Sequence, residues 1–339
     1  METNNMTQDA FARRPGQGDI SEAKVVRWLR EQDRYLILTH VRPDGDTLGC
    51  ASALCLTLRK LGKCAYIQPN PDITPFIGDY LELPFAPADF VPDQVVAVDL
   101  AAETMFPEMD RPELLEDIAL CIDHHPSNSH YARRLCLDAG AAAAAEILYR
   151  ICSELVELDE PIARALYIGI ATDCGCFVYS NTTSETHRIA AELMKYVPVK
   201  ALNKHFFQTR SFVQLRLEAM LLASEQFFEN GKIAVASTSM ADKAAVGAVD
   251  SDCDELPSYA SAIEGVLCSA TIRELKPGQW KVSLRCDPDY INGSDICARM
   301  GGGGHAAAAG ATLPPDLTED QAREMVLNNI YAVLRGGNG

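Results

Sequence analysis

The chain has 339 residues, of which 47% are hydrophobic, and its formal net charge at pH 7 is −17. This length suggests two domains, and the composition is typical of a soluble globular protein. No uninterrupted apolar run of about 18 residues occurs, so we expect no membrane-spanning helix. The acidic balance argues against a surface that tracks the phosphates of long duplexes, but it is compatible with a small anionic substrate held in one cleft.

The N-terminus and the cysteines bear on where the protein works. Residues 1–18 are polar and lack the apolar stretch of a signal peptide, so we expect a disordered leader on a cytoplasmic protein. Without a secretion signal, the twelve cysteines are expected to be reduced and mostly buried. Cys174 and Cys176 have one residue between them, which is too close for a CxxC motif. No second pair has zinc-finger spacing, so structural zinc is not expected.

The first half of the chain alternates helical periodicity with short apolar runs. We predict helices at residues 21–30, 48–61, 139–152, 161–172 and 184–194, and strands at 35–38, 64–68, 94–98 and 118–122. The proline-rich segment 69–92 should be irregular. Continuous apolar strands separated by helices predict a parallel sheet covered on both faces, and ligands bind beyond the carboxyl ends of the strands in such sheets.

The second half predicts another α/β unit. Strands are expected at 233–237, 265–272 and 280–285, and a closing helix at 319–334. We therefore predict an α/β fold with an N-terminal parallel-sheet domain at 19–197 and a smaller C-terminal domain with a mixed sheet at 230–336. A polar, helical linker at 198–229 would join them, with the active site in the cleft between the domains.

Three of the predicted strands end in histidine or aspartate, and one predicted helix ends in aspartate. The residues are His40, Asp44, Asp46, Asp99, Asp123, His124, His125 and Asp173. A lone aspartate at such a place is usually a cap or turn former. Two adjacent histidines and an aspartate directly after a buried strand are harder to explain in that way, so the convergence at one sheet edge predicts a functional site.

These residue types favour a site for hard metal ions. Neutral imidazole and carboxylate oxygen suit Mn²⁺, Mg²⁺ or Fe²⁺ better than they suit metals that prefer thiolates. Six side chains would suffice for two ions that share one carboxylate: His40, Asp44, Asp46, Asp99, His124 and Asp173. The four carboxylates among them would balance the charge of two divalent ions. An aspartate beside a histidine commonly fixes the tautomer of a metal-bound imidazole, which is a role for Asp123.

Five segments together resemble the motifs of the DHH phosphoesterase superfamily. They are T-H-V-R-P-D-G-D at Thr39–Asp46 followed by Leu48-Gly49, V-A-V-D ending at Asp99, D-H-H-P-S-N from Asp123, T-D-C-G from Thr172, and the glycine-rich run Gly301–Gly310. The last resembles the signature of the DHH-associated C-terminal domain. The motifs occur in the right order over roughly residues 20 to 335, which one motif alone would not establish.

Within the superfamily, the chain is similar to the short two-domain group of bifunctional oligoribonucleases and 3′-phosphoadenosine 5′-phosphate (pAp) phosphatases. RecJ-like exonucleases and membrane-bound cyclic di-AMP phosphodiesterases carry further domains that this chain has no room for. Family II inorganic pyrophosphatases lack a glycine-rich histidine loop of this kind. Cys174 and Cys50 replace the threonine or serine that is commoner in two motifs, which leaves substrate preference open but removes no proposed ligand.

The resemblance implies a role for each motif residue. One Mn²⁺ would be held by His40, Asp44 and Asp99, and a second by Asp46, Asp99, His124 and Asp173, with Mg²⁺ or another divalent ion as alternatives. His125 would face the scissile phosphate and Asp123 would support the histidines. The substrate phosphate or nucleotide end would be held by Arg285, Gly302, Gly303, Gly304 and His305. Alternatively, the glycines form a flexible linker and Arg285 a surface ion pair.

The activity that the resemblance implies is two-metal hydroxide attack on a phosphoester. The substrates would be short oligoribonucleotides (nanoRNA), cleaved to mononucleotides by an exonuclease, and pAp, converted to AMP. We expect neither long duplexes nor membranes as partners, and a homodimer is compatible with the sequence. One alternative is a stand-alone phosphodiesterase for cyclic di-AMP or its linear product pApA. A more distant one is a catalytically idle nucleotide-binding protein, against which the complete ligand set argues.

Overall fold

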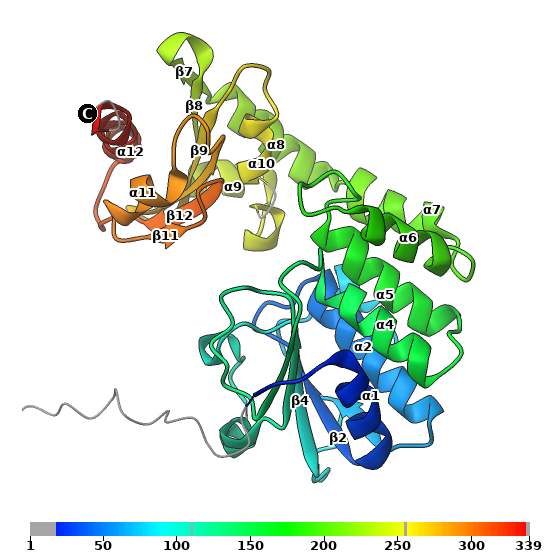
Figure 1. Cartoon of the computed structure of the whole chain (residues 1–339). Helices are drawn as coiled ribbons and strands as arrows, with labels where there is room; N and C mark the ends of the chain where they lie inside the picture. The colour runs from blue at the N-terminus through cyan, green and yellow to red at the C-terminus, as the bar shows by residue number, and fades with distance from the viewer. Residues whose placement is uncertain (1–17, 110, 254–255, 337–339) are drawn as a thin grey trace, which may run out of the picture. The chain divides into compact units, whose positions relative to one another are not determined.

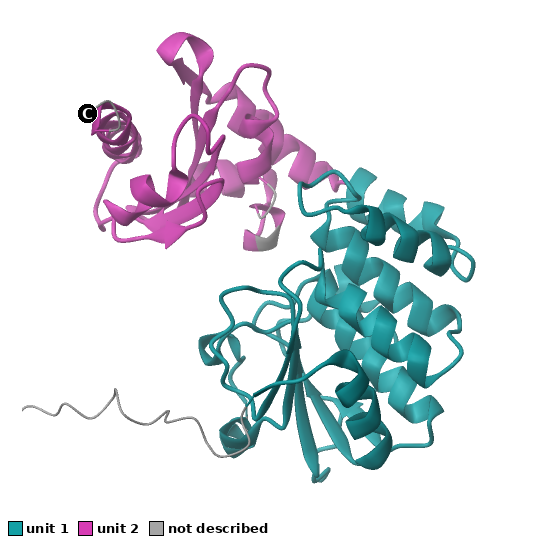
Figure 2. Cartoon of the chain, viewed as in Figure 1, with its two compact units in different colours: residues 1–209 teal, residues 210–339 magenta. Residues whose placement is uncertain are grey.

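The computed structural model describes residues 18–109, 111–253 and 256–336. Of the predicted disordered leader at 1–18, all but Gly18 lies outside these ranges. Contacts divide the chain into two compact units, Met1–Thr209 and Arg210–Gly339 (Figure 2). The division falls inside the segment 198–229, whose role as a linker stays a prediction. Within the described ranges, no helix is long and apolar enough to cross a membrane.

The first unit is built on a six-stranded sheet, of order β1-β6-β5-β4-β2-β3, in which all neighbouring strands are parallel. Its strands are β1 (Gly18–Asp19), β2 (Tyr35–Leu38), β3 (Ala65–Ile67), β4 (Gln94–Val98), β5 (Leu120–Asp123) and β6 (Arg134–Leu137). The predicted parallel sheet is confirmed. β1 and β6 were not predicted, because such short segments carry too few apolar residues to show periodicity. The carboxyl ends of β5, β4 and β2 lie side by side.

Four helices cover one face of this sheet (Figure 1): α1 (Glu22–Glu31), α2 (Gly45–Lys60), α4 (Ala144–Leu155) and α5 (Glu160–Asp173). The opposite face is covered by irregular chain and two short helices, η1 (Glu103–Met105) and η2 (Pro112–Asp117). The short helix α3 (Pro75–Gly78) packs instead beside α2. The sheet is therefore buried on both faces, as predicted, but long helices cover only one. Proline excludes long helices from the segment 69–92, which forms part of the other cover. The unit ends with α6 (Ser184–Leu193), α7 (Val199–Asn203) and the π-helix η3 (Lys204–Gln208).

The second unit contains a six-stranded mixed sheet of order β11-β12-β10-β9-β8-β7. Its strands are β7 (Gln226–Phe228), β8 (Ile233–Thr238), β9 (Cys268–Lys276), β10 (Gln279–Cys286), β11 (Gly303–Gly304) and β12 (Ala308–Thr312). β8 and β9 are parallel and the other pairs antiparallel, so the predicted mixed sheet is confirmed. The helical elements are α8 (Phe212–Ala223), η4 (Glu229–Gly231), α9 (Met240–Val246), η5 (Asp250–Cys253), α10 (Leu256–Ser261), α11 (Gly293–Ala298) and α12 (Glu319–Gly336). β7 lies in a segment that was expected to be helical.

Two glycines of α2 allow an unusually close approach to α5. A Cβ atom on Gly49 would lie 2.4 Å from the carbonyl oxygen of Ala165, and one on Gly45 would lie 2.2 Å from Oγ1 of Thr172. Both distances are shorter than any real carbon–oxygen contact, so only glycine fits at either position. This contact brings the start of α2 next to the end of α5, the two places from which Asp46 and Asp173 project.

The Gly49→Ala substitution should therefore lower the free energy of unfolding by about 1–3 kcal/mol, because the added methyl group meets backbone and the helices must separate. Urea-induced unfolding followed by circular dichroism would measure it. Gly140→Ala is the matched control, since its Cβ would lie 3.4 Å from the nearest atom, a side-chain oxygen of Asp138. Equal stability of the two variants would contradict the proposed close packing.

Candidate metal centre

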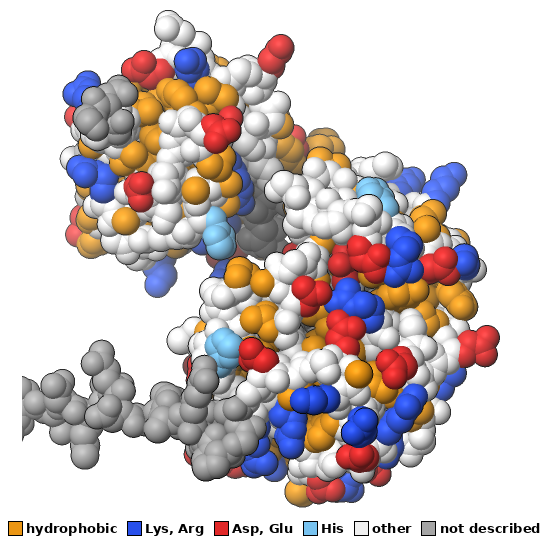
Figure 3. All heavy atoms as spheres, viewed as in Figure 1, with side chains coloured by type: hydrophobic (Ala, Val, Ile, Leu, Met, Phe, Trp, Pro, Cys, Tyr) orange, Lys and Arg blue, Asp and Glu red, His pale blue; other side chains and the backbone are white. Residues whose placement is uncertain are grey.

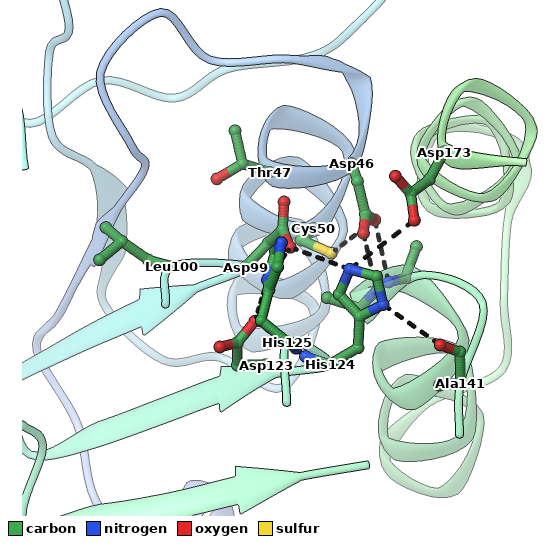
Figure 4. A network of polar contacts seen from close by, with 12 residues as sticks. Asp46, Thr47, Cys50, Asp99, Leu100, Asp123, His124, His125, Ala141 and Asp173 are labelled. Atoms are coloured by element: carbon green, nitrogen blue, oxygen red, sulfur yellow. Dashed lines mark hydrogen bonds and ion pairs between the residues drawn. The ribbon is translucent and has the colours of Figure 1, made fainter. Parts of the chain in front are cut away.

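Carboxylates and imidazoles gather at the carboxyl ends of β2, β4 and β5. Figure 4 shows Asp46, Asp99, His124 and Asp173 directed toward one another from α2, from the end of β4, from the end of β5 and from α5. Among the described residues, three groups have ligand atoms within 4.8 Å of one another: His40, Asp44 and Asp99; Asp46, His124 and Asp173; and Asp99, His124 and His125. The groups share members and so form one connected site, which the sequence predicted from the strand ends.

The helix α2 begins at Gly45, whereas the sequence predicted a start at Leu48, and Asp44 explains the difference. Its side chain caps the helix, since Oδ1 accepts hydrogen bonds from the backbone amides of Asp46 at 3.0 Å and Thr47 at 3.1 Å. An aspartate cap satisfies amides that the helix leaves unpaired. The cap places Asp46 in the first helical turn, so its position in the site is fixed by backbone geometry.

Asp46 is held from a second element. Its Oδ2 accepts a hydrogen bond from the amide of Ala144 at 2.7 Å and its Oδ1 accepts one from Ala145 at 3.0 Å, both at the start of α4. The N-terminus of a helix favours negative charge. The carboxylate is buried, and a Cβ on Gly169 would lie 2.9 Å from its Oδ1. Asp46 is therefore locked between α4 and α5.

Asp99 turns into the site through an unusual backbone conformation. Its φ is 52°, in the left-handed region that few residues other than glycine adopt, while its amide donates to the carbonyl of Ile122 at 2.9 Å. The side chain is 3% exposed, and its Oδ1 has no hydrogen-bond partner among the described residues. A buried carboxylate without a partner is costly, so this oxygen fits the role of a metal ligand.

The imidazoles of His40 and His124 present their Nε2 atoms to these carboxylates. His40 Nδ1 lies 2.8 Å from the carbonyl oxygen of Val41, and His124 Nδ1 lies 3.2 Å from that of Ala141. A carbonyl oxygen only accepts, so the proton of each neutral ring is at Nδ1 and Nε2 carries a lone pair. His124 Nε2 is 3.6 Å from Asp99 Oδ1. Acceptors that face one another at this distance fit a cation between them.

Burial and mutual repulsion disfavour the charged forms of these carboxylates. Burial, followed by the charges of Asp173 and Asp44, raises the pKa of Asp46 to about 8. Burial and the same kind of repulsion raise the pKa of Asp99 well above its ordinary value. Burial also raises the pKa of the nearby Cys50 thiol, so thiolate is absent from the donor set. Oxygen and neutral nitrogen donors that lack positive charge suit a divalent ion such as Mn²⁺ or Mg²⁺.

Asp123 positions the paired histidines. It is fully buried at the end of β5, and its Oδ1 accepts hydrogen bonds from the amide of His124 at 2.8 Å and from Nδ1 of His125 at 2.8 Å. Its Oδ2 accepts one from the side chain of Asn128 at 2.6 Å. Every contact of this carboxylate is thus directed to its own segment. Its geometry suits the supporting role that was predicted for it, which stays a prediction.

Comparison with known proteins decides the family. Residues 34–170 match the family model described as DHH family, N-terminal domain, and residues 230–332 match the DHHA1 domain. The chain is 32% identical over 303 residues to the bifunctional oligoribonuclease and PAP phosphatase NrnA of Thermus thermophilus, covering 88% of this chain and 89% of that protein. This chain belongs to the DHH family. The predicted family is thereby confirmed, and the DHH-family chain is a metal-dependent hydrolase.

Further relatives agree. The protein of the same name from Bacillus subtilis is 26% identical over 302 residues, which cover 86% of the DHH-family chain and 93% of the relative. A solved structure of an exopolyphosphatase-related protein from Bacteroides fragilis has a TM-score of 0.81 at 20% identity, covering 92% of this chain and 95% of that one. At this identity, the second comparison supports the fold alone.

The residues predicted to bind substrate all lie in the second unit of the DHH-family chain. Arg285 is on β10 and lines a cavity of about 300 Å³ with Cys286, Asp287 and Ala307, among others. Ala308 on β12 pairs with Arg285 on β10. The backbone amide of His305 donates a hydrogen bond to the carbonyl oxygen of Ala308 at 2.8 Å, which closes a turn. Arg285 and His305 therefore lie at the same end of the sheet.

The glycine run leads into a tightly packed hairpin. Gly303 and Gly304 form β11, which leads into the hairpin to β12, and a Cβ on Gly302 would lie 2.2 Å from the carbonyl oxygen of Gly310. The amides of Gly301 and Gly302 donate to carbonyls of α11. Close strand packing is thus what requires glycine at position 302. The role of these glycines in substrate binding stays a prediction.

Two supporting asparagines escaped the sequence reasoning. Asn128 is buried and donates to Asp123, as described above, and Asn70 is buried and donates to the carbonyl oxygen of His40 at 2.9 Å. Asn128 lies inside the D-H-H-P-S-N motif, which was the available signal. Asn70 lies in a proline-rich segment 30 residues from its partner, and nothing in the sequence alone points to that contact.

The raised carboxyl pKa values predict how the metal-stripped protein responds to pH. The folded protein keeps a proton on Asp46 up to about pH 8, whereas the unfolded chain releases it near pH 4. Stability should therefore fall as pH rises between these values, by at most about 1.4 kcal/mol per pH unit for one group. Thermal unfolding in the presence of a chelator, from pH 5.5 to 8.5, would measure it.

Two controls belong to this experiment. Asp46→Asn should show a shallower dependence on pH, and saturating Mn²⁺ should reverse the trend, because a cation favours the deprotonated carboxylates. A melting temperature of the chelated protein that is constant over this range would contradict the assigned electrostatics.

Proposed function

We propose that this DHH-family protein is a phosphoesterase that uses two divalent ions, with Mn²⁺ as the first candidate, to cleave short RNA oligonucleotides to mononucleotides and pAp to AMP. The observation that carries the proposal is the position of Asp99, which belongs to one ligand group with His40 and to another with His124. A carboxylate shared in this way is what a two-ion site requires. The names of the relatives from Thermus thermophilus and Bacillus subtilis support the substrate class.

The ligand sets are those that the family resemblance implies, and the groups of close donor atoms support them: one group is the first set, and another contains three members of the second. One ion would be held by His40, Asp44 and Asp99, and the second by Asp46, Asp99, His124 and Asp173. Divalent ions in these positions would activate a water molecule and offset the negative charge of the scissile phosphate. A cation must displace protons from buried carboxylates such as Asp46, whose pKa is raised to about 8. Metal binding, and with it activity, should therefore increase toward alkaline pH.

His125 would handle the proton of the leaving group. Its Nδ1 donates to Asp123 at 2.8 Å, which leaves Nε2 as the nitrogen available to a substrate. The hydrogen bond with Asp123 raises the pKa of His125 against the opposing effect of burial. A protonated imidazole can donate from Nε2 to the leaving oxygen, and Asp123 fixes the orientation of the ring as it does so.

The second unit would grip the phosphate or nucleotide end of the substrate through Arg285 and His305. Arg285 lines a cavity large enough for a phosphate group, and His305 is exposed at the neighbouring turn. On the face drawn in Figure 3, Lys and Arg side chains are interspersed with Asp and Glu. A surface with mixed charges favours a short ligand that is bound at a few points. It does not favour a long duplex, which would need a continuous basic surface along its phosphates.

Substitution of Asp99, the proposed shared ligand, should lower activity without lowering the stability of the metal-stripped protein. Asp99→Asn should lower Mn²⁺-dependent hydrolysis of pAp by at least about 10³-fold, because both ions lose a ligand, while the metal-stripped variant should melt no lower than the metal-stripped parent. The stability is kept because the substitution removes a buried carboxylate and its repulsion with the neighbouring aspartates. Turnover at a tenth of the parental rate or more would exclude Asp99 as a shared ligand.

Arg285→Ala and His305→Ala should mainly raise KM for pAp and a dinucleotide, by about tenfold each, because each loses one charged or polar contact with phosphate. Steady-state kinetics would separate KM from kcat. Arg335→Ala on α12 removes the same charge away from β10 and is the control. Unchanged KM in both test variants would rule out the assigned recognition residues.

Product analysis by chromatography tests the function itself. Pure protein with Mn²⁺ would be incubated in parallel with pAp, a linear dinucleotide, a longer RNA and cyclic di-AMP. Turnover of pAp and the dinucleotide with little of the others supports the proposal. Preference for cyclic di-AMP would assign the protein to cyclic dinucleotide hydrolysis, and absence of turnover with several metals would indicate a nucleotide-binding protein without activity.

A further inference from the structure

Two cysteines of the second unit face each other across neighbouring strands. Cys268 on β9 and Cys286 on β10 are direct partners in the antiparallel pairing, and their Sγ atoms are 3.7 Å apart. The next pair, Leu267 and Asp287, is joined by a backbone hydrogen bond of 2.8 Å, so the cysteines occupy a position without one. Opposing Cα atoms at such positions are about 4.5 Å apart, within the range that a disulfide spans.

The pair is poorly explained as a metal site. Among the described residues, no group of three close ligand atoms includes a cysteine. Two thiols alone do not make a structural zinc site, which needs four ligands. Their close approach therefore points to chemistry between the two sulfur atoms.

The two thiols differ in accessibility. Cys286 is half-buried and lines the cavity of about 300 Å³ beside Arg285, whereas Cys268 is fully buried behind it. A Cβ on Gly293 would lie 3.1 Å from Cys286 Sγ, so the glycine leaves room for this thiol. The hydrogen bond with Cys268 lowers the pKa of Cys286, and the charge of Arg285 acts in the same direction against burial. An oxidant entering the cavity meets the more reactive thiol first.

We propose that Cys286 and Cys268 form a reversible disulfide on reaction with a low-molecular-weight disulfide. The Cys286 thiolate attacks one sulfur of that molecule, which expels one small thiol and leaves a mixed disulfide. Cys268, after loss of its proton, then attacks the Cys286 sulfur and expels the second small thiol. Two protein thiols are thus oxidised to one disulfide, and one small disulfide is reduced to two thiols.

The bond would change the cavity that Arg285 lines; this consequence rests on the proposed function. The sulfur atoms must approach from 3.7 Å to about 2.05 Å, which shifts the side chain next to Arg285. A displacement on the order of 1 Å is large for a binding site and can cost up to about 10²-fold in rate. The oxidised protein should therefore bind pAp more weakly, with a KM raised about tenfold.

Peptide mapping of the full-length protein tests the disulfide. Trypsin leaves Cys268 in residues 244–273 together with Cys253, and Cys286 in residues 286–299 together with Cys297. The Cys253→Ala, Cys297→Ala double variant therefore carries one cysteine in each peptide. After treatment with glutathione disulfide and alkylation of free thiols, mass spectrometry should find the two peptides linked, and dithiothreitol should separate them.

A resolving-cysteine variant sharpens the test. In Cys268→Ser, added to the double variant, the linked peptides should be absent and glutathione should accumulate on Cys286, because no second thiol displaces it. Alkylation of both thiols after oxidation, or a stable glutathione adduct in the presence of Cys268, would overturn the proposal. If Cys268→Ser fails to fold, Cys268→Ala provides the same readout.

Kinetics separates this proposal from the proposed function. If the reduced protein hydrolyses neither pAp nor a dinucleotide, the function fails, and the peptide map still decides the disulfide. If the reduced protein is active and oxidation leaves KM unchanged, the effect on the cavity is excluded. A rise in KM that accompanies the linked peptides and that dithiothreitol reverses supports both the bond and its consequence.

Discussion

The repulsion between buried aspartates is the constraint on which the first unit depends. Asp46, Asp99 and Asp173 converge from three elements, and burial followed by repulsion from neighbouring carboxylates raises their pKa values. A protein keeps such an arrangement only when something of positive charge offsets it, since uncompensated charge in the interior is costly. The chain belongs to a metal-dependent family, and metal binding explains this energetic cost, because the same groups could hold a divalent ion.

The rest of the unit holds these side chains against their repulsion. The N-terminus of α4 binds Asp46, and the glycines of α2 permit the contact with α5. The left-handed backbone conformation of Asp99 turns its own side chain into the site. Asp123 is treated differently, since hydrogen bonds satisfy it fully and it orients the histidines. Two kinds of carboxylate thus lie side by side: one has a raised pKa and suits a cation, and the other is held in its charged form by neighbouring hydrogen-bond donors. Different surroundings of this kind give neighbouring acids different roles.

In the second unit, the arginine that is proposed to bind substrate lies beside one thiol of the proposed disulfide. Arg285 and Cys286 are consecutive on β10 and line the same cavity, so a bond formed at the thiol changes the wall of that cavity. Gly302 and Gly304 allow the chain at β11 to pack closely against β12. A thiol pair in the interior of the sheet would be inert, and its place at a cavity wall is what makes it relevant to a ligand.

The sequence by itself determined the family, the parallel sheet and the set of acidic and histidine residues at its edge. These follow from local signals: apolar runs such as 94–98 identify strands, and parallel strands align their carboxyl ends, so Asp99 and His124 had to meet. Helix starts were predicted less well, because the cap by Asp44 depends on side-chain direction. Short strands such as β6 and β7 escaped prediction for lack of periodicity.

Only the tertiary structure decided which atoms support the site. The amides that bind Asp46 lie 98 and 99 residues away, Asn70 reaches His40 across 30 residues, and the glycine run became a hairpin. The same holds for Cys268 and Cys286, whose meeting depends on strand register. Composition and periodicity report the local environment of each residue, whereas these contacts depend on how distant elements pack, and a pattern along the chain does not contain that information.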